Sequence, residues 1–183
     1  MSIFKQMKFA FGILTILSLL NLSCEDAVYD LDNPNDPENM DLDPPALFFH
    51  PSEINTKVDS SFSVQLYGLK LNPAAAAHLD VRYDWRGVQV ESVVADTFFQ
   101  SLNDPFQIVI DDIQGTVDIF IYLLPDTLID QNEGGTWSLA TVYFTATSTR
   151  GSELLFGENT RMRDANNDPV GVRSFGSGFI NVE

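Results

Sequence analysis

The feature that most constrains the fold is a two-residue alternation of apolar and polar side chains through residues 44–183. Phe62, Val64 and Leu66 alternate with polar neighbours, which is the pattern of a strand with one buried face. The same alternation returns between residues 76 and 83. No window of about a dozen residues carries the apolar stripe of a 3.6-residue period that a helix requires. The alternation therefore predicts an all-β domain.

Turn-forming residues divide this region into short segments of strand length. Clusters that contain Gly, Pro, Asn or Asp stand between them. The strand-like segments are residues 46–50, 61–67, 76–83, 88–94, 106–110, 116–124, 137–147, 153–156 and 178–182. We predict from them a nine-stranded antiparallel β-sandwich over residues 44–183.

The N-terminus has the organisation of a secretory signal peptide, which we assign to residues 1–23. Two lysines precede an apolar run at 9–20, which is too short for the ~20 apolar residues of a spanning helix. The only cysteine of the chain, Cys24, stands four positions after the end of this run. Residues 20–24 resemble a bacterial lipobox, with Asn21 where leucine is preferred. The resemblance implies lipidation of Cys24; the alternative is an ordinary signal peptide with a chance cysteine.

Residues 24–43 differ sharply in composition from the segments on either side. Positions 25–43 hold eight acidic residues and no basic one. Such a stretch cannot bury enough apolar surface to offset its chain entropy, so we predict a disordered, extended tether. Acidic residues after a lipidated cysteine resemble the surface-export signal of Bacteroidetes-type lipoproteins. This resemblance implies an outer-membrane lipoprotein displayed at the cell surface; the alternative is a solvated periplasmic spacer.

Charge and composition exclude several classes of function. The formal net charge is −16, so the field of the chain repels nucleic acids and acidic lipid surfaces. One cysteine excludes an intramolecular disulfide and a cysteine-based zinc site. The sequence carries no Ser-His-Asp or P-loop signature. We therefore expect no catalysis, no resident metal and no cofactor.

The order of the strand-like segments resembles that of a cohesin domain. A pair of Tyr and Asp at 83–84 ends the third strand, and a valine-rich strand follows it. The segments that carry the resemblance are residues 62–66, 77–84, 88–93, 135–144, 163–170 and 178–182. The resemblance implies a jelly-roll sandwich without catalytic activity. It also implies a dockerin-like protein partner, and dockerins are borne by glycan-degrading enzymes.

Two outward-facing rows form the candidate partner-binding face. Alternation turns one row of each strand away from the core. The residues are His78, Asp80 and Arg82 from one strand, and Asp118, Phe120, Tyr122 and Leu124 from the other. By resemblance these rows match the dockerin-contacting strands of cohesins. Ala76 and His78 stand where the best-known cohesins carry an asparagine and an aspartate. The alternative is that a neighbouring strand or the tether covers this row.

A second functional class is a carbohydrate-binding module of a glycan-capture lipoprotein. Sugar-binding modules of this fold present a flat row of exposed aromatic rings. The candidates are Tyr67, Trp85, Phe120, Tyr122 and Trp137. Placement of the two tryptophans in the core would weaken this interpretation.

Two further patterns have a structural and a chemical interpretation. His78 and Asp80 share one face of a strand, so they form either part of a metal or acid–base pair or two ordinary surface residues. Residues 164–168 match the opening of a calcium loop, but Pro169 and Phe175 replace the glycine and glutamate that the loop requires. A hairpin turn is the interpretation that we favour at residues 164–168.

Overall fold

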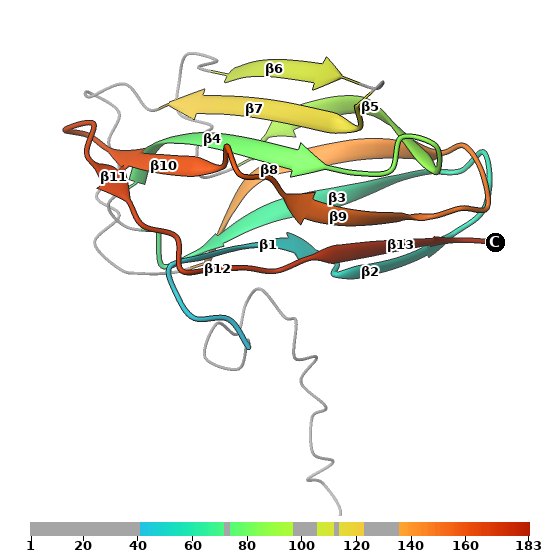
Figure 1. Cartoon of the computed structure of the whole chain (residues 1–183), viewed down its shortest axis with the longest axis horizontal. Helices are drawn as coiled ribbons and strands as arrows, with labels where there is room; N and C mark the ends of the chain where they lie inside the picture. The colour runs from blue at the N-terminus through green and yellow to red at the C-terminus, as the bar shows by residue number, and fades with distance from the viewer. Residues whose placement is uncertain (1–40, 72–73, 97–105, 112–113, 123–135) are drawn as a thin grey trace, which may run out of the picture. The chain divides into compact units, whose positions relative to one another are not determined.

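The computed structural model describes residues 41–71, 74–96, 106–111, 114–122 and 136–183. These residues form thirteen strands in two sheets, and no helix occurs among them (Figure 1). The predicted all-β sandwich is confirmed.

The first sheet has five strands in the order β12-β1-β3-β8-β5. Their bounds are β12 (Ser174–Phe175), β1 (Ala46–His50), β3 (Ser61–Leu69), β8 (Thr136–Ala146) and β5 (Val88–Ala95). The long pairing of β3 with β8 runs antiparallel from Ser61 opposite Thr145 to Leu69 opposite Thr136. This pairing makes β3 and β8 the centre of the sheet.

The second sheet has eight strands and is built around β4 (Ala74–Arg82). On one edge, β4 pairs with β7 (Thr116–Tyr122), which in turn pairs with β6 (Phe106–Asp111). On its other edge, β4 pairs first with β10 (Arg161–Asp164) and then with β9 (Ser152–Phe156). The remaining strands are β11 (Pro169–Val170), β13 (Gly178–Val182) and β2 (Glu53–Thr56).

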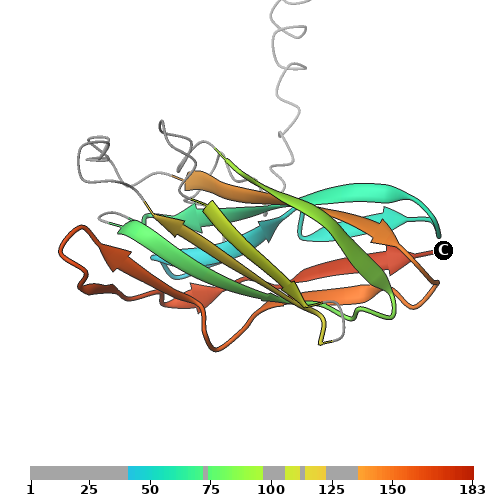
Figure 2. The ribbon, with the colours of Figure 1, turned by 90° about the horizontal axis from the view of Figure 1, so that it is seen from above.

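The core lies between the two sheets and is made from the inward residues of both. Phe144 of β8, Leu66 of β3 and Leu79 of β4 have no exposed surface. The predicted inward row of β4 is confirmed, because Leu79 and Val81 are buried; in the outward row Arg82 is exposed but Asp80 is not. Figure 2 shows the two layers from above. Burial of such side chains stabilises each by about 1.5–3 kcal/mol relative to exposure.

Both ends of the domain cross from one sheet to the other at the same place. β1 belongs to the five-stranded sheet and β2 to the eight-stranded sheet; β12 and β13 divide in the same way. β1 runs parallel to β12, and β2 runs parallel to β13. The Gly176 N–H donates to the Leu47 carbonyl at 2.8 Å, and the Phe179 N–H donates to the Ser52 carbonyl at 2.7 Å. The N- and C-terminal strands of the domain are thus fixed to each other.

The strand number is higher than the nine that the sequence predicts. The additional strands are β2, β10, β11 and β12. They have two to four residues each, which is too few to display an alternation. The two parallel pairings are those of β1 with β12 and of β13 with β2. The other strand pairs of the described residues are antiparallel, as predicted.

The predicted signal peptide, Cys24 and most of the tether lie outside the described residues, as does Leu124. The last tether residues are described: Leu42 packs against the small cluster of Ala46, Phe48 and Leu69. The Asp43 carbonyl accepts a hydrogen bond from the Ser174 hydroxyl at 2.9 Å. In the described part of the chain, no helix is long and apolar enough to span a membrane.

The alternation in β8 predicts very different costs for two adjacent aromatic residues. Phe144 is fully buried and stacks on Phe62 at 5.6 Å, whereas Tyr143 is 41% exposed. We expect Phe144→Ala to lower the free energy of unfolding by about 3–5 kcal/mol. The control, Tyr143→Ala, should cost less than about 1 kcal/mol. Urea unfolding followed by circular dichroism measures both; equal losses would contradict this assignment of faces.

Candidate functional site

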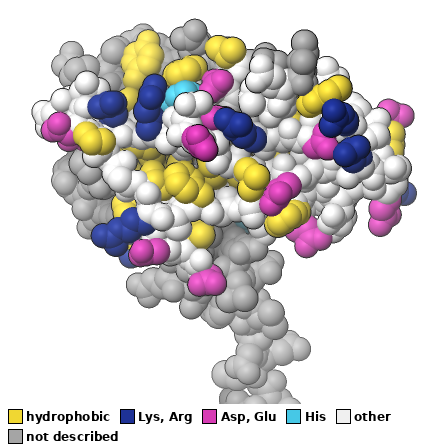
Figure 3. Space-filling model, in the orientation of Figure 1, with side chains coloured by type: hydrophobic (Ala, Val, Ile, Leu, Met, Phe, Trp, Pro, Cys, Tyr) yellow, Lys and Arg dark blue, Asp and Glu magenta, His cyan; other side chains and the backbone are white. Residues whose placement is uncertain are grey.

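The candidate face is the outer surface of the eight-stranded sheet at β4 and β7. The antiparallel register places His78 opposite Phe120, Asp80 opposite Asp118, and Ala76 opposite Tyr122. Side chains opposite each other in a sheet lie on the same face. The two predicted rows are therefore side by side. Figure 3 shows hydrophobic side chains mixed with acidic and basic ones on this side of the molecule, with a histidine among them.

His78 is the centre of a rigid polar and aromatic cluster. Its Nε2 lies 2.6 Å from Asp118 Oδ1, and its ring stacks on Phe120 at a centroid distance of 4.2 Å. The His78 side chain is only 12% exposed, and its Nδ1 is buried without a hydrogen-bond partner. The acid–base pairing that we considered for His78 and Asp80 is wrong, because the carboxylate that contacts His78 belongs to Asp118.

Apolar surface is exposed beside this cluster. Tyr122 is 50% exposed at the end of β7. Val109 of β6, opposite Asp118, is 47% exposed. Sequence reasoning missed Val109, although the alternation in β6 places it on the outer side. The face thus combines exposed apolar groups with a fixed His–Asp pair.

Two arginines extend the face on the other edge of β4. Arg161 of β10 lies opposite His78, and Arg163 lies opposite Ala76. The Arg163 Nη1 donates to the Asn167 carbonyl at 2.6 Å, which holds this side chain on the β10–β11 turn. Arginine and aromatic residues are enriched at protein interfaces. No pattern in the sequence distinguishes these two arginines, because the four residues of β10 are too few to be recognised as a strand.

Asp80 does not belong to the exposed row, which corrects our expectation. It is only 1% exposed, because the turn between β9 and β10 closes over it. Its Oδ2 accepts hydrogen bonds from the Asn159 side-chain amide and from Arg82 Nη2, each at 3.2 Å. A Cβ at position 157 would lie 2.3 Å from Asp80 Oδ2, so only glycine permits this close approach. Asp80 therefore joins the turn to β4 and is not available to a partner.

Arg82 is exposed and lies at the end of the row. Its side chain is 51% exposed, and its guanidinium contacts the buried Asp80 carboxylate. Opposite it on β7 is Thr116. Leu124, the last predicted residue of the row, is outside the described residues.

The 164–168 segment forms the hairpin turn that we favoured. β10 and β11 pair antiparallel on either side of it. The Asp164 Oδ1 accepts hydrogen bonds from the backbone N–H groups of Asn166 and Asp168, at 2.9 and 2.8 Å. This carboxylate therefore stabilises the turn itself. Across the described ranges, no cluster of three or more metal-ligating side chains is present.

The aromatic residues considered for sugar binding do not form one row. Tyr67 is in the five-stranded sheet and stacks on Phe48 at 5.5 Å. Trp137 of β8 packs against the main core. Trp85 is 43% exposed, but it lies in the turn after β4 and not beside Phe120 or Tyr122.

Comparison with solved structures identifies the fold. A cohesin in a type I cohesin–dockerin complex from Clostridium thermocellum superposes with a TM-score of 0.59 at 14% identity, covering 75% of this chain and 92% of that chain. A non-cellulosomal cohesin from the archaeon Archaeoglobus fulgidus also gives a TM-score of 0.59, at 16% identity and 75% and 90% coverage. The domain has a cohesin fold.

Other cohesins agree with this result. A type II cohesin dyad from an adaptor scaffoldin of Acetivibrio cellulolyticus gives a TM-score of 0.62 at 15% identity, covering 75% of this chain and 48% of the dyad. No protein-family model and no curated protein matches the sequence. The cohesin fold predicted from the order of strands is thus confirmed by structure at a level of identity that sequence comparison does not detect.

Burial of Asp80 leads to a test of its structural role. In Asp80→Ala, the donors from Arg82 and Asn159 lose their acceptor, so we expect the free energy of unfolding to fall by about 2 kcal/mol or more. Glu158→Ala, an exposed position in the same turn, is the matched control and should change it by less than about 0.5 kcal/mol. A loss in Asp80→Ala no larger than in the control would refute the role.

Proposed function

We propose that this chain is a non-catalytic binding module that holds a protein partner on the outer face of β4, β6 and β7. The observation that carries the proposal is the mixed character of this face. Exposed Tyr122 and Val109 flank the fixed pair of His78 and Asp118. Protein interfaces combine aromatic and apolar anchors with oriented polar groups in this way.

The solved cohesins suggest the class of partner. Cohesins from Clostridium thermocellum and Acetivibrio cellulolyticus form complexes with dockerins. We infer a dockerin-like module as the partner of this chain too. A link to polysaccharide degradation would follow if that module belongs to a glycan-degrading enzyme.

On the described strands β4 and β7, a partner would find no carboxylate that is free of contacts within the domain. Asp80 is buried, and the Asp118 carboxylate already contacts His78. Tyr122 and Val109 would then supply the anchoring surface, while Arg161 would supply an exposed cation at the rim. We therefore expect shape and apolar contact to contribute more affinity than ion pairs.

Absence of catalysis is part of the same proposal. A general base needs an accessible ring nitrogen next to the reacting proton. In His78, Nε2 contacts Asp118 and Nδ1 is buried. This pair is suited to fixing the surface of the sheet and not to transferring protons to a substrate.

We also propose that the domain is anchored to the bacterial outer membrane through a lipidated Cys24. The support is the position of the only cysteine, four positions after the end of the apolar run, together with the acidic segment that follows. Two or more acyl chains would hold a protein on a membrane nearly permanently, at ~0.8 kcal/mol per buried CH₂. The 24–43 tether would then present the domain at the cell surface.

The binding face is tested by Tyr122→Ala. The full-length protein, purified in a mild detergent, captures partners from the native organism, and each candidate is then produced recombinantly for calorimetry. Truncation of an aromatic anchor costs about 2 kcal/mol, so we expect ~30-fold weaker binding of the true partner.

Tyr143→Ala is the matched control, because Tyr143 is 41% exposed on the other sheet. It should bind the partner as tightly as the unmodified protein. Equal affinity in the Tyr122→Ala variant would remove the β4–β7 face from the proposal.

The anchor is tested by Cys24→Ser. In a bacterial host, radiolabelled palmitate should enter the unmodified protein, and the label should be lost in the variant because the thiol is replaced. Incorporation of the label in both proteins, or in neither, would refute lipidation at Cys24.

A further inference from the structure

An open pocket lies at one end of the eight-stranded sheet, away from Tyr122. Its volume is about 660 Å³, within the 300–1,000 Å³ range of small-ligand sites. The turns β4–β5, β6–β7 and β8–β9 meet there, beside the outer residues of β9 and β13. The pocket shares Arg82 with the predicted row and is otherwise separate from it.

The pocket concentrates arginines in a strongly acidic protein. Arg82, Arg86 and Arg150 line it, which is half of the six arginines in a chain of net charge −16. Two carboxylates, those of Asp84 and Glu153, also line the pocket. Arg82 contacts the Asp80 carboxylate and Arg150 contacts the Asp84 carboxylate, so the charges of these two arginines are balanced within the protein. What the pocket offers an anionic ligand is the terminal guanidinium N–H groups beyond these two contacts, which suit a single carboxylate.

Asp84 occupies only the Nε of Arg150, so the terminal N–H groups of this guanidinium remain for a ligand. Its Oδ2 accepts from Arg150 Nε at 2.7 Å, and its Oδ1 accepts from the Arg86 backbone N–H at 3.0 Å. The Arg86 N–H lowers the pKa of Asp84, burial opposes this effect, and Arg150 lowers the pKa further. The carboxylate therefore stays ionised and keeps Arg150 directed along the pocket wall.

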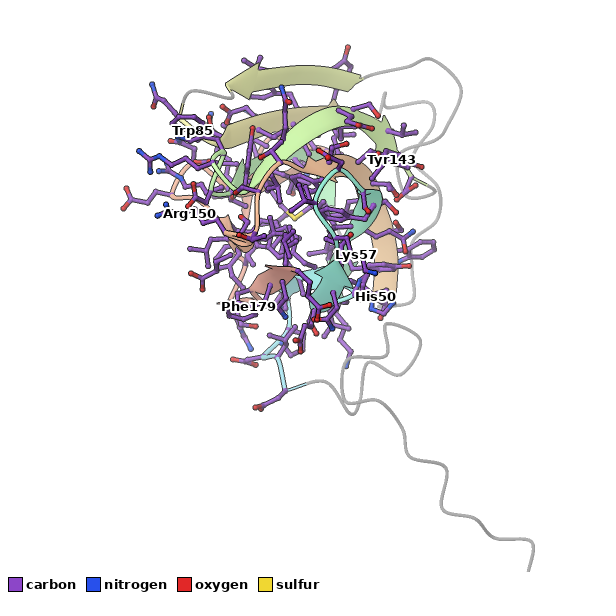
Figure 4. The ribbon with its side chains drawn as sticks, turned by 90° about the vertical axis from the view of Figure 1, so that its right-hand side faces the viewer. His50, Lys57, Trp85, Tyr143, Arg150 and Phe179 are labelled. Atoms are coloured by element: carbon purple, nitrogen blue, oxygen red, sulfur yellow. The ribbon has the colours of Figure 1, made fainter. Side chains whose placement is uncertain are left out.

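Aromatic surface stands next to these arginines. Trp85 is 43% exposed, and the Arg86 guanidinium lies 4.9 Å from its ring centroid. Phe179 of β13 also lines the pocket and is 49% exposed. Figure 4 shows Trp85, Arg150 and Phe179 on the same side of the domain, with His50 and Tyr143 on the other side.

The backbone beneath the pocket is fixed by a close approach. Gly151 adopts φ +68°, a conformation that favours glycine, and a Cβ there would lie 2.4 Å from the Ile180 carbonyl oxygen. A Cβ at Gly87 would lie 1.9 Å from the Gly151 carbonyl oxygen. The turns that carry Trp85 and Arg150 are thus held against each other, so the two side chains start from a preorganised backbone.

We propose that this pocket binds an acidic saccharide, with Trp85 stacked on a sugar ring and Arg150 paired with its carboxylate. A pyranose has faces of C–H groups, whose partial positive charge matches the negative face of an indole. Its hydroxyl groups suit the Glu153 carboxylate, which also lines the pocket. The Asn181 amide nitrogen already donates to Glu53 Oε1 and Asn55 Oδ1, so Asn181 offers a sugar its Oδ1 as an acceptor. An arginine fork matches a carboxylate in geometry as well as in charge. This site is independent of the partner face proposed above.

An acidic peptide would match the arginines but leave the ring of Trp85 without a flat apolar partner. The concave shape also favours a small chain-like ligand over a globular protein, which requires ~800 Å² of surface per partner. A uronic-acid oligosaccharide satisfies the charge, the ring and the size of the pocket together.

The test uses the full-length protein and three probes: oligogalacturonate, a neutral oligogalactoside of the same length, and an oligoglutamate peptide. Calorimetry measures the affinities. We expect oligogalacturonate to bind at least about tenfold more tightly than either of the other probes. Trp85→Ala and Arg150→Ala should each weaken its binding by about tenfold or more.

The controls are Tyr143→Ala for the loss of an exposed ring and Arg173→Ala for the loss of an exposed cation; both lie outside the pocket. Neither should alter saccharide affinity, and neither should Tyr122→Ala, so failure here is distinguishable from failure of the partner face. NMR of the unmodified protein adds a readout without mutation, because the indole N–H signal of Trp85 should shift and that of Trp137 should not. Equal binding of all probes, stronger binding of oligoglutamate, no binding, or an unmoved Trp85 signal would overturn the proposal.

Discussion

Pairing of β4 on both of its edges is the constraint on which the rest of the structure depends. β7 occupies one edge, and β10 and β9 share the other. Because β4 is central, its inward residues, including Leu79 and Val81, have no exposed surface. Because both edges of β4 are paired, the strand cannot turn over, and its outward side chains stay on the outer side of the sheet. The position of β4 thus determines which residues a partner can reach.

The break between β10 and β9 explains the unexpected burial of Asp80. β10 pairs with β4 as far as His78, and β9 pairs with β4 from Val81 on, so neither strand pairs with Asp80. There the Asp80 carbonyl accepts a hydrogen bond from the Gly157 N–H at 2.7 Å, and the Asp80 carboxylate is buried below the turn. A buried carboxylate requires hydrogen-bond donors, which Arg82 and Asn159 supply. The outer face is therefore divided: a His–Asp and aromatic cluster lies on one side of Asp80, and the arginine-lined pocket lies on the other.

Sequence alone could predict the long elements and their faces. Alternation in β3 and β4 assigns their inward residues correctly, and the order of strands indicated the cohesin fold. Short strands such as β10 escaped because four residues cannot establish a period. The burial of Asp80 escaped for another reason: the residues that cover it, Gly157 and Asn159, are more than seventy positions away along the chain. Proximity of this kind depends on tertiary contacts that no local pattern records.

The same distinction applies to Trp85. Its sequence context, a turn after a strand, gave no indication that β8–β9 and β13 would bring Arg150 and Phe179 beside it. The five aromatic residues considered for sugar binding share only their residue type, and they are scattered over both sheets and the turn after β4. Only the fold separates the ones that pack in the core from the one that borders a pocket.

The central claim is that a protein partner occupies the outer face of β4 and β7. A crystal structure of the complex with that partner tests it most directly, through the exposed fraction of Tyr122. We predict that this fraction, 50% in the free domain, falls to that of a buried residue, while Tyr143 keeps its exposure. A complex in which Tyr122 stays exposed and the partner lies on the five-stranded sheet would contradict the account.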